Sequence, residues 1–290
     1  MYFKARNGTY KRVPQIPNRF PDGEVEGMTV YYTSAYDNSK VTAFKPGFRV
    51  LAGYADRRTS GGVTKWNAIC FRCYNAKNFG GDNQAPCSDK TVDNVELPNK
   101  ACPGGIRTTV RFPTCWDSVN LDSPDHMTHV RYVLITGYLR SIRPFVTSQI
   151  PVADSKFDSY PETGTFENNG KCPSTHPVKL PQLMFEVIWD TSSFNDKSIW
   201  PADGSQPFVF SQGDDTGYGQ HGDYLFEWEG SSLQKAIDAN CFGATCSALK
   251  TQGFADANKC AVPKTVQEDV DGWLTRIPNR ISIKEKRFTP

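Results

Sequence analysis

Ile106-Arg-Thr-Thr-Val-Arg-Phe112 and Leu183-Met-Phe-Glu-Val-Ile-Trp189 are the stretches that decide the fold class. The first alternates, so every second residue from Ile106 to Phe112 lies on one face of a predicted β-strand. The second is a short, mostly apolar run between Pro181 and Asp190, which predicts a central strand. Both are too short to favour helices of ordinary length.

On either side of these stretches the sequence predicts further short strands and only a few helices. Further β-leaning runs, separated by Pro and Gly turns, lie at residues 28–32, 48–51, 208–210 and 224–228. The clearest helix covers 231–238, where Ser231 or Ser232 can serve as the N-cap, and a second short helix is predicted at 246–250. This pattern predicts a mainly β fold, a sandwich or jelly-roll-like single domain with long disulfide-held loops and one or two short helices.

Composition excludes several classes of protein. The 290 residues include 33 Lys and Arg against 31 Asp and Glu, which gives a formal net charge of +2 at pH 7. A nucleic-acid binder that works through bulk charge would be far more basic. No run approaches 18 apolar residues, so no membrane span is expected, and 12% aromatic residues exclude a disordered chain. We expect a monomer without nucleic-acid partners.

The cysteines indicate a secreted protein with three or four disulfides and one unpaired thiol. The chain has nine of them: Cys70, Cys73, Cys87, Cys102, Cys115, Cys172, Cys241, Cys246 and Cys260. Structural zinc at Cys70-Phe-Arg-Cys73 and reduced core cysteines are the alternatives, although Cys87 and Cys102 do not supply a second C-x-x-C pair. Met1-Tyr-Phe-Lys-Ala-Arg has no apolar segment of a signal peptide, so the N-terminus and the cysteines point to different compartments.

The histidines are the first candidates for chemistry, because imidazole titrates near neutral pH and ligates metals when neutral. All four lie in segments rich in turn-forming and polar residues: His126, His129, His176 and His221. In one interpretation they form a copper or zinc site, with His126 and His129 as nearby ligands and His176 or His221 completing it. In a second they perform metal-free acid/base catalysis, and in a third they only hydrogen-bond carbonyls and hold loops.

In the catalytic interpretation, a histidine or Tyr218 transfers protons and Asp125 or Asp223 orients the histidine. Lys179 or Arg107 then offsets developing negative charge.

Two further kinds of site have candidate residues in the sequence. A glycosidase pair of Glu186 with Asp214 or Asp215 is disfavoured, because nothing in the spacing brings these carboxylates together. Surface platforms for sugar rings are candidate roles of aromatic residues, namely Trp66, Trp116 and Tyr218.

Several segments together resemble one family. They are Tyr2-Phe-Lys-Ala-Arg-Asn-Gly-Thr-Tyr-Lys-Arg-Val-Pro14, Gly27-Met-Thr-Val-Tyr-Tyr32, Cys115-Trp-Asp with Leu121-Asp-Ser-Pro-Asp-His126 and His129-Val, Cys172-Pro-Ser-Thr-His-Pro-Val-Lys-Leu-Pro-Gln182 and Gly217-Tyr-Gly-Gln-His-Gly-Asp-Tyr224. The chain resembles the fungal secreted domain of unknown function 1996, often found beside cell-wall-sensor (WSC) carbohydrate-binding domains. The likeness covers about residues 2–275 and implies a secreted, disulfide-bonded protein with no established reaction.

The resemblance implies, by analogy, a role on cell-wall or plant polysaccharide. We therefore expect the chain to bind or act on polysaccharide through a His-centred polar site. A non-catalytic metal-binding or structural cell-wall protein is the alternative. The expected domain covers 1–275, followed by a C-terminal tail at 276–290.

The sequence departs from the family pattern at two places. Family members usually begin earlier, with a signal peptide, a Ser-x-His-x-His segment and a Cys pair, so the N-terminal part of the domain is expected to be missing here. Members also run from His129-Val-Arg-Tyr132 almost directly to Pro161-Glu-Thr-Gly. Residues 133–159 are therefore expected to be an atypical insertion, which we interpret as translated intron; a spliced transcript that retains it and gives a folded product would refute this.

Overall fold

The computed structural model describes residues 1–16, 27–34, 39–60, 68–76, 86–87, 89, 91–133, 171–239, 246–250, 252–257, 259, 262–263, 265–267 and 270–278. The expected insertion lies outside these residues except for Val133, so its nature stays a prediction. Trp66 also lies outside them. The proposed domain boundary after residue 275 stays a prediction as well, although Ile277 is buried against Tyr2, Tyr10 and Val209.

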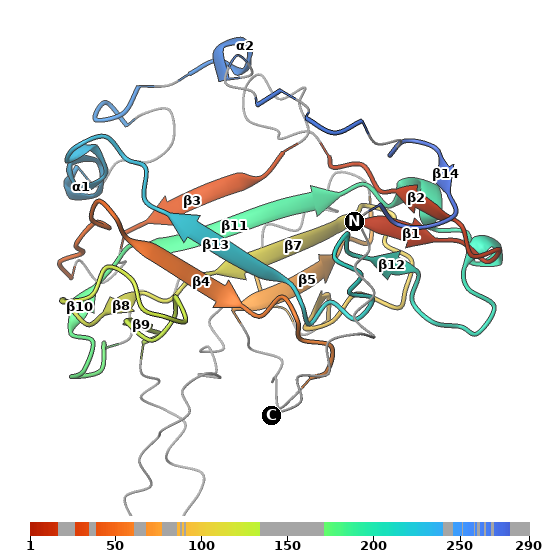
Figure 1. Cartoon of the computed structure of the whole chain (residues 1–290), viewed down its shortest axis with the longest axis horizontal. Helices are drawn as coiled ribbons and strands as arrows, with labels where there is room; N and C mark the ends of the chain where they lie inside the picture. The colour runs from red at the N-terminus through yellow and green to blue at the C-terminus, as the bar shows by residue number, and fades with distance from the viewer. Residues whose placement is uncertain are drawn as a thin grey trace, which may run out of the picture.

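A five-stranded antiparallel sheet with the order β3-β11-β7-β5-β6 forms the centre of the molecule (Figure 1). Its strands are β3 (Thr29–Thr33), β11 (Gln182–Trp189), β7 (Ile106–Arg111), β5 (Ile69–Cys73) and β6 (Asp93–Asn94). The two stretches that decide the fold class are β7 and β11, and β11 is central as predicted. Their register places Val110 opposite both Phe185 and Ile69, so one face of the sheet is apolar.

A two-stranded ribbon of β4 (Arg49–Gly53) and β13 (His221–Leu225) crosses this apolar face (Figure 1). Val50, Ala52, Gly222 and Tyr224 are its buried residues. A Cβ on Gly222 would lie only 2.9 Å from the Phe112 ring, so the close approach of ribbon to sheet requires glycine there. The ribbon residues between these buried ones point away from the large sheet, which supports the ribbon from below.

Two smaller sheets flank this sandwich. The four-stranded one has the order β12 (Phe208–Val209), β1 (Tyr2–Lys4), β2 (Tyr10–Arg12) and β14 (Trp273–Leu274). The three-stranded one has the order β10 (Val178–Lys179), β8 (Cys115–Trp116) and β9 (Val130–Arg131). Among the residues that the structure describes, the helices are α1 (Ser232–Asp238), α2 (Phe254–Ala257) and the 3-10 turns Ser192–Phe194 and Lys197–Ile199. The predicted mainly β sandwich is thus confirmed.

Aromatic residues dominate the two large clusters of the core. One lies between the ribbon and the large sheet and includes Phe48, Phe112 and Leu183. The other includes Phe3, on β1, and Phe71, on β5. Burying a side chain of this size contributes roughly 1.5–3 kcal/mol, so these clusters join the sheets into one body.

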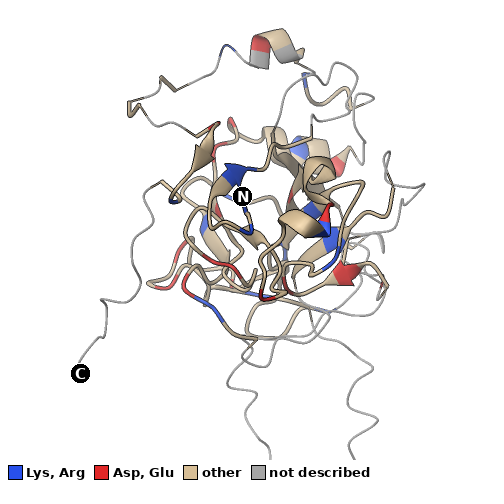
Figure 2. Cartoon of the chain, turned by 90° about the vertical axis from the view of Figure 1, so that its right-hand side faces the viewer, with Lys and Arg blue, Asp and Glu red and all other residues tan. Residues whose placement is uncertain are grey.

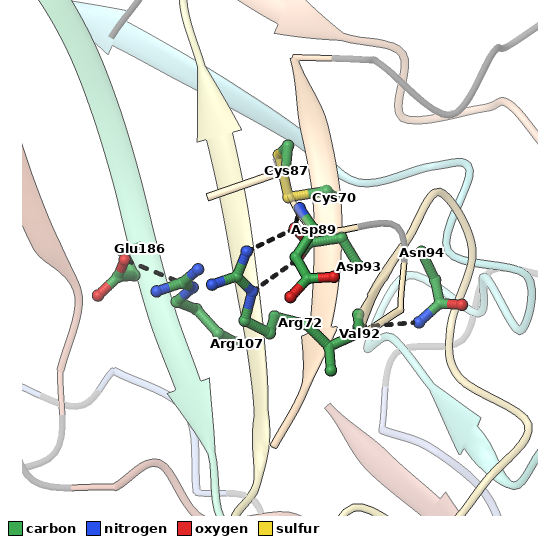
Figure 3. The surroundings of a disulfide bond; sticks show 9 residues. All are labelled: Cys70, Arg72, Cys87, Asp89, Val92, Asp93, Asn94, Arg107 and Glu186. Atoms are coloured by element: carbon green, nitrogen blue, oxygen red, sulfur yellow. Dashed lines mark hydrogen bonds and ion pairs between the residues drawn. A yellow bond between two sulfur atoms is a disulfide. The ribbon is translucent and has the colours of Figure 1, made fainter. Parts of the chain in front are cut away.

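The other face of the large sheet is polar and nevertheless buried. All six residues of β7 are buried, including Arg107, Thr109 and Arg111. The neighbouring Arg72 on β5 is fully buried and holds Asp93 of β6 through Nε–Oδ1 and Nη2–Oδ2 hydrogen bonds of 2.7 and 2.6 Å (Figure 3). Buried charges need such paired geometry to offset the loss of water.

Three disulfides join described cysteines: Cys70–Cys87, Cys73–Cys102 and Cys115–Cys172. Cys246 is also disulfide-bonded. The predicted disulfide framework is therefore confirmed. The zinc alternative at the C-x-x-C segment is wrong, because Cys70 and Cys73 each bond to a different distant cysteine. The expected unpaired thiol stays a prediction, since Cys241 and Cys260 lie outside the described residues.

Two details of the secondary-structure prediction are wrong. The strand predicted at 224–228 lies earlier, at His221–Leu225, because pairing with β4 sets its bounds. The helix predicted at 246–250 is a turn, and a short helix lies instead at Phe254–Ala257. Ser231 is the N-cap of α1, but its side chain makes no capping hydrogen bond.

The end of the molecule that carries the four-stranded sheet shows basic and acidic segments interspersed (Figure 2). This distribution agrees with the nearly balanced composition of the chain. Among the described residues, no helix is long and apolar enough to cross a membrane.

Candidate functional site

Two of the four histidines are buried and hold loops together. His129 packs against Phe48 at a ring distance of 5.2 Å and is only 2% exposed. His176 accepts at Nδ1 from the Thr175 hydroxyl, 2.9 Å away, and donates from Nε2 to the Thr128 carbonyl, 3.0 Å away. Because a carbonyl oxygen can only accept a hydrogen bond, the proton of the neutral His176 ring is on Nε2. His176 therefore fastens the segment after Cys172 to the loop that contains His129.

The hydrogen bonds of His129 fix its tautomer. Ser123 Oγ lies 2.9 Å from His129 Nδ1 and donates its own proton to Asp125, also 2.9 Å away. The imidazole must therefore donate from Nδ1 to Ser123. Since the Ser123 proton is held by a carboxylate, Ser123 is not an activated nucleophile.

Asp125 is a loop anchor rather than the orienting partner of a histidine. It accepts from the backbone N–H groups of Met127 and Thr128 and from the hydroxyls of Ser123 and Thr128. Burial raises its pKa, but these hydrogen bonds outweigh burial and hold the pKa well below its usual value. The structural interpretation thus accounts for His129, His176 and Asp125.

Acid is expected to destabilise the protein through His129. Burial lowers the pKa of His129 below its ordinary 6.5. The Arg49 carbonyl and nearby carboxylates raise this pKa, but their effect is smaller than that of burial. The unfolded chain therefore takes up a proton first, and stability is lost as the pH falls below about 6.5 toward the folded-state pKa. Melting temperatures measured between about pH 7.5 and pH 5 should fall less in His129→Asn, whose amide can still donate to Ser123. Equal slopes in both proteins would contradict this assignment.

The other two histidines adjoin the β4–β13 ribbon, His126 beside the edge of β4 and His221 in β13 itself. His126 Nδ1 contacts Asp122 Oδ1 at 2.6 Å, and the His126 carbonyl accepts from the Leu51 N–H of β4. His126 has a positive φ of 55°, a conformation that is uncommon for a residue with a Cβ. His221 begins β13, opposite Gly53, directly after the glycine-rich turn that precedes this strand.

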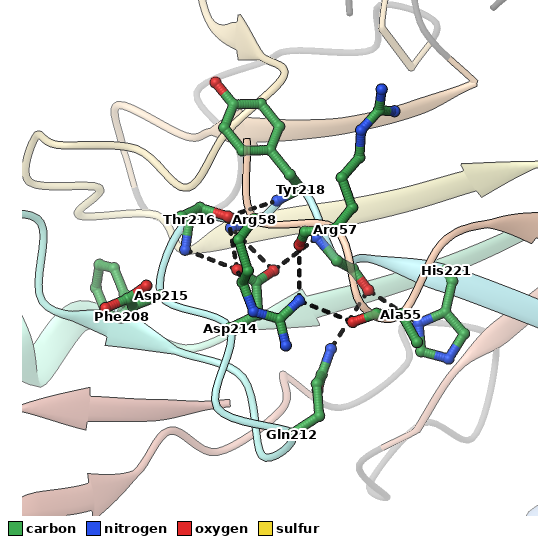
Figure 4. A network of polar contacts seen from close by, with 12 residues as sticks. Ala55, Arg57, Arg58, Phe208, Gln212, Asp214, Asp215, Thr216, Tyr218 and His221 are labelled. Atoms are coloured by element: carbon green, nitrogen blue, oxygen red, sulfur yellow. Dashed lines mark hydrogen bonds and ion pairs between the residues drawn. The ribbon is translucent and has the colours of Figure 1, made fainter. Parts of the chain in front are cut away.

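A buried carboxylate builds the turn that places His221 (Figure 4). Asp214 is fully buried and accepts from the backbone N–H groups of Thr216, Gly217 and Gly219 and from the Thr216 hydroxyl, at 2.6–3.1 Å. The Gly219 carbonyl in turn accepts from His221 Nδ1 at 2.9 Å. This bond fixes the Nδ1–H tautomer of neutral His221.

His221 and Asp223 are two predicted catalytic residues that lie near each other, although the Gly219 carbonyl, and not Asp223, orients the imidazole. His221 Nε2 lies 3.9 Å from Asp223 Oδ2, and the Asp223 side chain is exposed. In neutral His221 the bonded Nδ1 leaves Nε2 as the basic nitrogen. Proton transfer is therefore chemically available at this end of β13.

Tyr218 and Lys179 make other contacts. The Tyr218 hydroxyl donates to Glu96 at 2.7 Å; burial and this carboxylate raise the pKa of Tyr218 to about 12, so it is not a base at neutral pH. Lys179 Nζ donates to Ser39 Oγ at 2.9 Å.

The disfavoured glycosidase pair is not formed. Glu186 contacts Tyr31 and lies 3.7 Å from Arg107 Nε on the large sheet, whereas Asp214 is enclosed in its own turn. Burial raises the pKa of Glu186, and the Arg107 guanidinium partly opposes this shift. Figure 3 shows Glu186 and Arg107 on neighbouring strands.

The histidines do not converge on one point. All four are described, yet the described residues contain no group of three or more His, Cys, Asp or Glu side chains placed to hold a metal ion. In the described residues, the histidines therefore do not fit the copper or zinc site of the first interpretation.

A groove of about 740 Å³ opens where β13 leaves the sandwich toward α1, beside β3 and β11. Aromatic side chains line it, among them Tyr32, Phe185 and Trp228. The rings of Tyr32 and Trp228 meet edge to face at 5.1 Å, which holds both in place. Val30 and Leu225 also line it and are exposed.

Polar groups accompany this apolar lining. Three exposed carboxylates, those of Asp223, Glu227 and Glu229, face the groove together with Lys250. Tyr224 is buried in the lining, and burial and the neighbouring Tyr32 raise the pKa of its hydroxyl. Asp223 lines the groove and also contacts His221, so the groove adjoins the His221–Asp223 pair.

A family model described as a domain of unknown function (DUF1996) matches residues 1–228, most of the chain. The chain belongs to the DUF1996 family. No curated protein and no solved structure matches it. The DUF1996 match includes β13 and ends at Trp228, within the groove.

In this DUF1996 chain, sequence reasoning missed most of the groove. Glu227-Trp-Glu229 was available as a signal, because an aromatic residue between two acids directly before a predicted helix is poor core sequence. Trp116 and Tyr218, the described candidates for sugar platforms, do not line the groove. Trp116 is 2% exposed and belongs to the core, the commoner place for an aromatic residue, so it offers no surface platform for a sugar ring.

Proposed function

We propose that this protein is secreted and binds a polysaccharide chain in the groove beside β13. The observation that supports this function is the combination of aromatic and carboxylate side chains on one open groove. A sugar ring has apolar C–H faces and a rim of hydroxyl groups. Aromatic side chains cover the faces, and carboxylates accept hydrogen bonds from the hydroxyls.

The exposure of apolar side chains supports a binding role. Val30, Leu225 and Leu249 remain in contact with water, although they line the same groove. Clustered exposed apolar groups with a polar rim are typical of ligand-binding surfaces. The disulfides support secretion, since disulfides persist mainly in oxidising compartments.

A reaction on the bound chain is the second candidate function. The His221–Asp223 pair favours it, because Asp223 lines the groove and His221 Nε2 is the basic nitrogen. Release of soluble sugar from a bound polysaccharide, lost in His221→Asn while binding persists, would favour the reaction over binding alone.

Trp228→Ala is expected to weaken binding to insoluble polysaccharide at least about tenfold, because central aromatic contacts usually dominate an interface. Cellulose, chitin and β-1,3-glucan are incubated with each protein, and the bound fraction is measured. Trp273→Ala is the matched control, since Trp273 is an exposed tryptophan on β14 outside the groove. Equal binding by both variants, with unchanged melting temperatures, would place the ligand elsewhere.

A further inference from the structure

The groove has a charge opposite to that of the chain. Its described lining contains the carboxylates of Asp223, Glu227 and Glu229 and one ammonium group, on Lys250, whereas the whole chain has a net charge of +2. Within the described part of the protein, no basic side chain forms an ion pair with Glu227 or Glu229. Asp223 has only the long contact to His221. These carboxylates are therefore available to a ligand.

Apolar side chains beside these carboxylates also indicate a ligand. Val30, Leu225 and Leu249 line the same groove and are 40%, 58% and 38% exposed. Clustered exposed apolar side chains with a polar rim are typical of ligand-binding surfaces. The Tyr224 hydroxyl does not contribute to this surface, because it is closed to solvent and lies beside the Tyr32 side chain.

We infer that the polysaccharide taken by this groove is a cationic amino-sugar polymer, one whose rings carry free amino groups. This inference rests on the proposed function. The protonated amines would meet the unpaired carboxylates, while the C–H faces of the rings would pack on Trp228 and Tyr32. The same carboxylates would repel polymers of uronic acids or sulfated sugars. An N-acylated amino sugar has the same ring without the charge, so it isolates the electrostatic contribution.

The experiment compares two oligosaccharides of equal length, a fully deacetylated hexosamine oligomer and its N-acetylated counterpart. Calorimetric titration at about pH 5.5 keeps both the amines and the carboxylates ionised. The deacetylated oligomer should bind about tenfold more tightly, because exposed charge pairs each contribute modestly. The double variant Glu227→Gln/Glu229→Gln should remove most of this preference. Asp203→Asn, an exposed carboxylate in the loop before β12, should leave it unchanged.

The outcomes separate this inference from the proposed function. Equal binding of both oligomers would overturn the amino-sugar preference and leave polysaccharide binding intact. Binding of neither, nor of any neutral glycan, would overturn both. Tight binding of an oligolysine peptide, equal to that of the amino-sugar oligomer, would show that charge alone is recognised and would overturn the assignment to sugar.

Discussion

Asp93→Ala is expected to cost about 3–5 kcal/mol of folding stability, the usual effect of removing one partner of a buried ion pair. Arg72 is 0% exposed and holds Asp93 by two hydrogen bonds, and Asp93 also accepts from the Asp89 N–H. The β5–β7 register sets Arg72 directly opposite Arg107, and like charges placed so repel each other. Without the carboxylate, that repulsion is less well compensated in a region of low dielectric.

Urea unfolding of Asp93→Ala measures this loss, with Asp256→Ala as control. Asp256 pairs with Lys259 on the surface, where both side chains are well exposed, and such pairs contribute at most about 1 kcal/mol. Arg72→Met in the Asp93→Ala background should recover part of the loss, because it removes the buried charge. A cost below about 1 kcal/mol for Asp93→Ala would show that the pair is not needed to keep Arg72 in the sheet.

Asp214→Ala is expected to destabilise the protein by about 3–5 kcal/mol, because several buried donors lose their acceptor together at about 1–3 kcal/mol each. The affected backbone N–H groups are those of Thr216, Gly217 and Gly219. The turn has no room to rearrange, since a Cβ on Gly217 would already lie 2.7 Å from the Leu97 backbone nitrogen.

Asp215→Ala is the matched control, because Asp215 is the adjacent carboxylate and is exposed. Its unfolding free energy should stay within about 0.5 kcal/mol of wild type. A second readout is the imidazole NMR signal of His221, which should shift in Asp214→Ala, because the Gly219 carbonyl that fixes its tautomer would move. Equal stability of the two variants would mean that water satisfies the turn in place of Asp214.

The sequence was sufficient to predict strands β3, β7 and β11 of the large sheet. It was not sufficient to predict that the polar face of this sheet is buried. Alternation in β7 correctly placed Ile106, Thr108 and Val110 on one face, because that face meets other apolar side chains. It could not show that Arg107 and Arg111 are buried too, since the opposite face of a strand normally meets water. That outcome depends on neighbouring strands, which periodicity does not identify.

The candidate site could be predicted only in part, and the reason is similar. The segments rich in turn-forming residues did contain His221 and Asp223, which lie beside the groove. However, residue type alone could not distinguish His221 from His176, whose two ring nitrogens are both occupied by loop contacts. The groove joins Val30, Phe185 and Leu249, which are far apart along the chain, so only the tertiary structure brings them together.

The Cys115–Cys172 bond makes a covalent ring of the stretch between its two cysteines, which are 57 positions apart. Within the ring, β8 and β9 are paired, and β10, which begins a few residues after Cys172, pairs with β8. Both sides of the crosslink are thus anchored whatever the length of chain between them. By loop-closure entropy, halving that length changes the free energy by only about 0.6 kcal/mol. A single peptide-bond cut within the ring would leave two pieces still covalently attached. The fold can therefore gain or lose sequence here with little thermodynamic consequence.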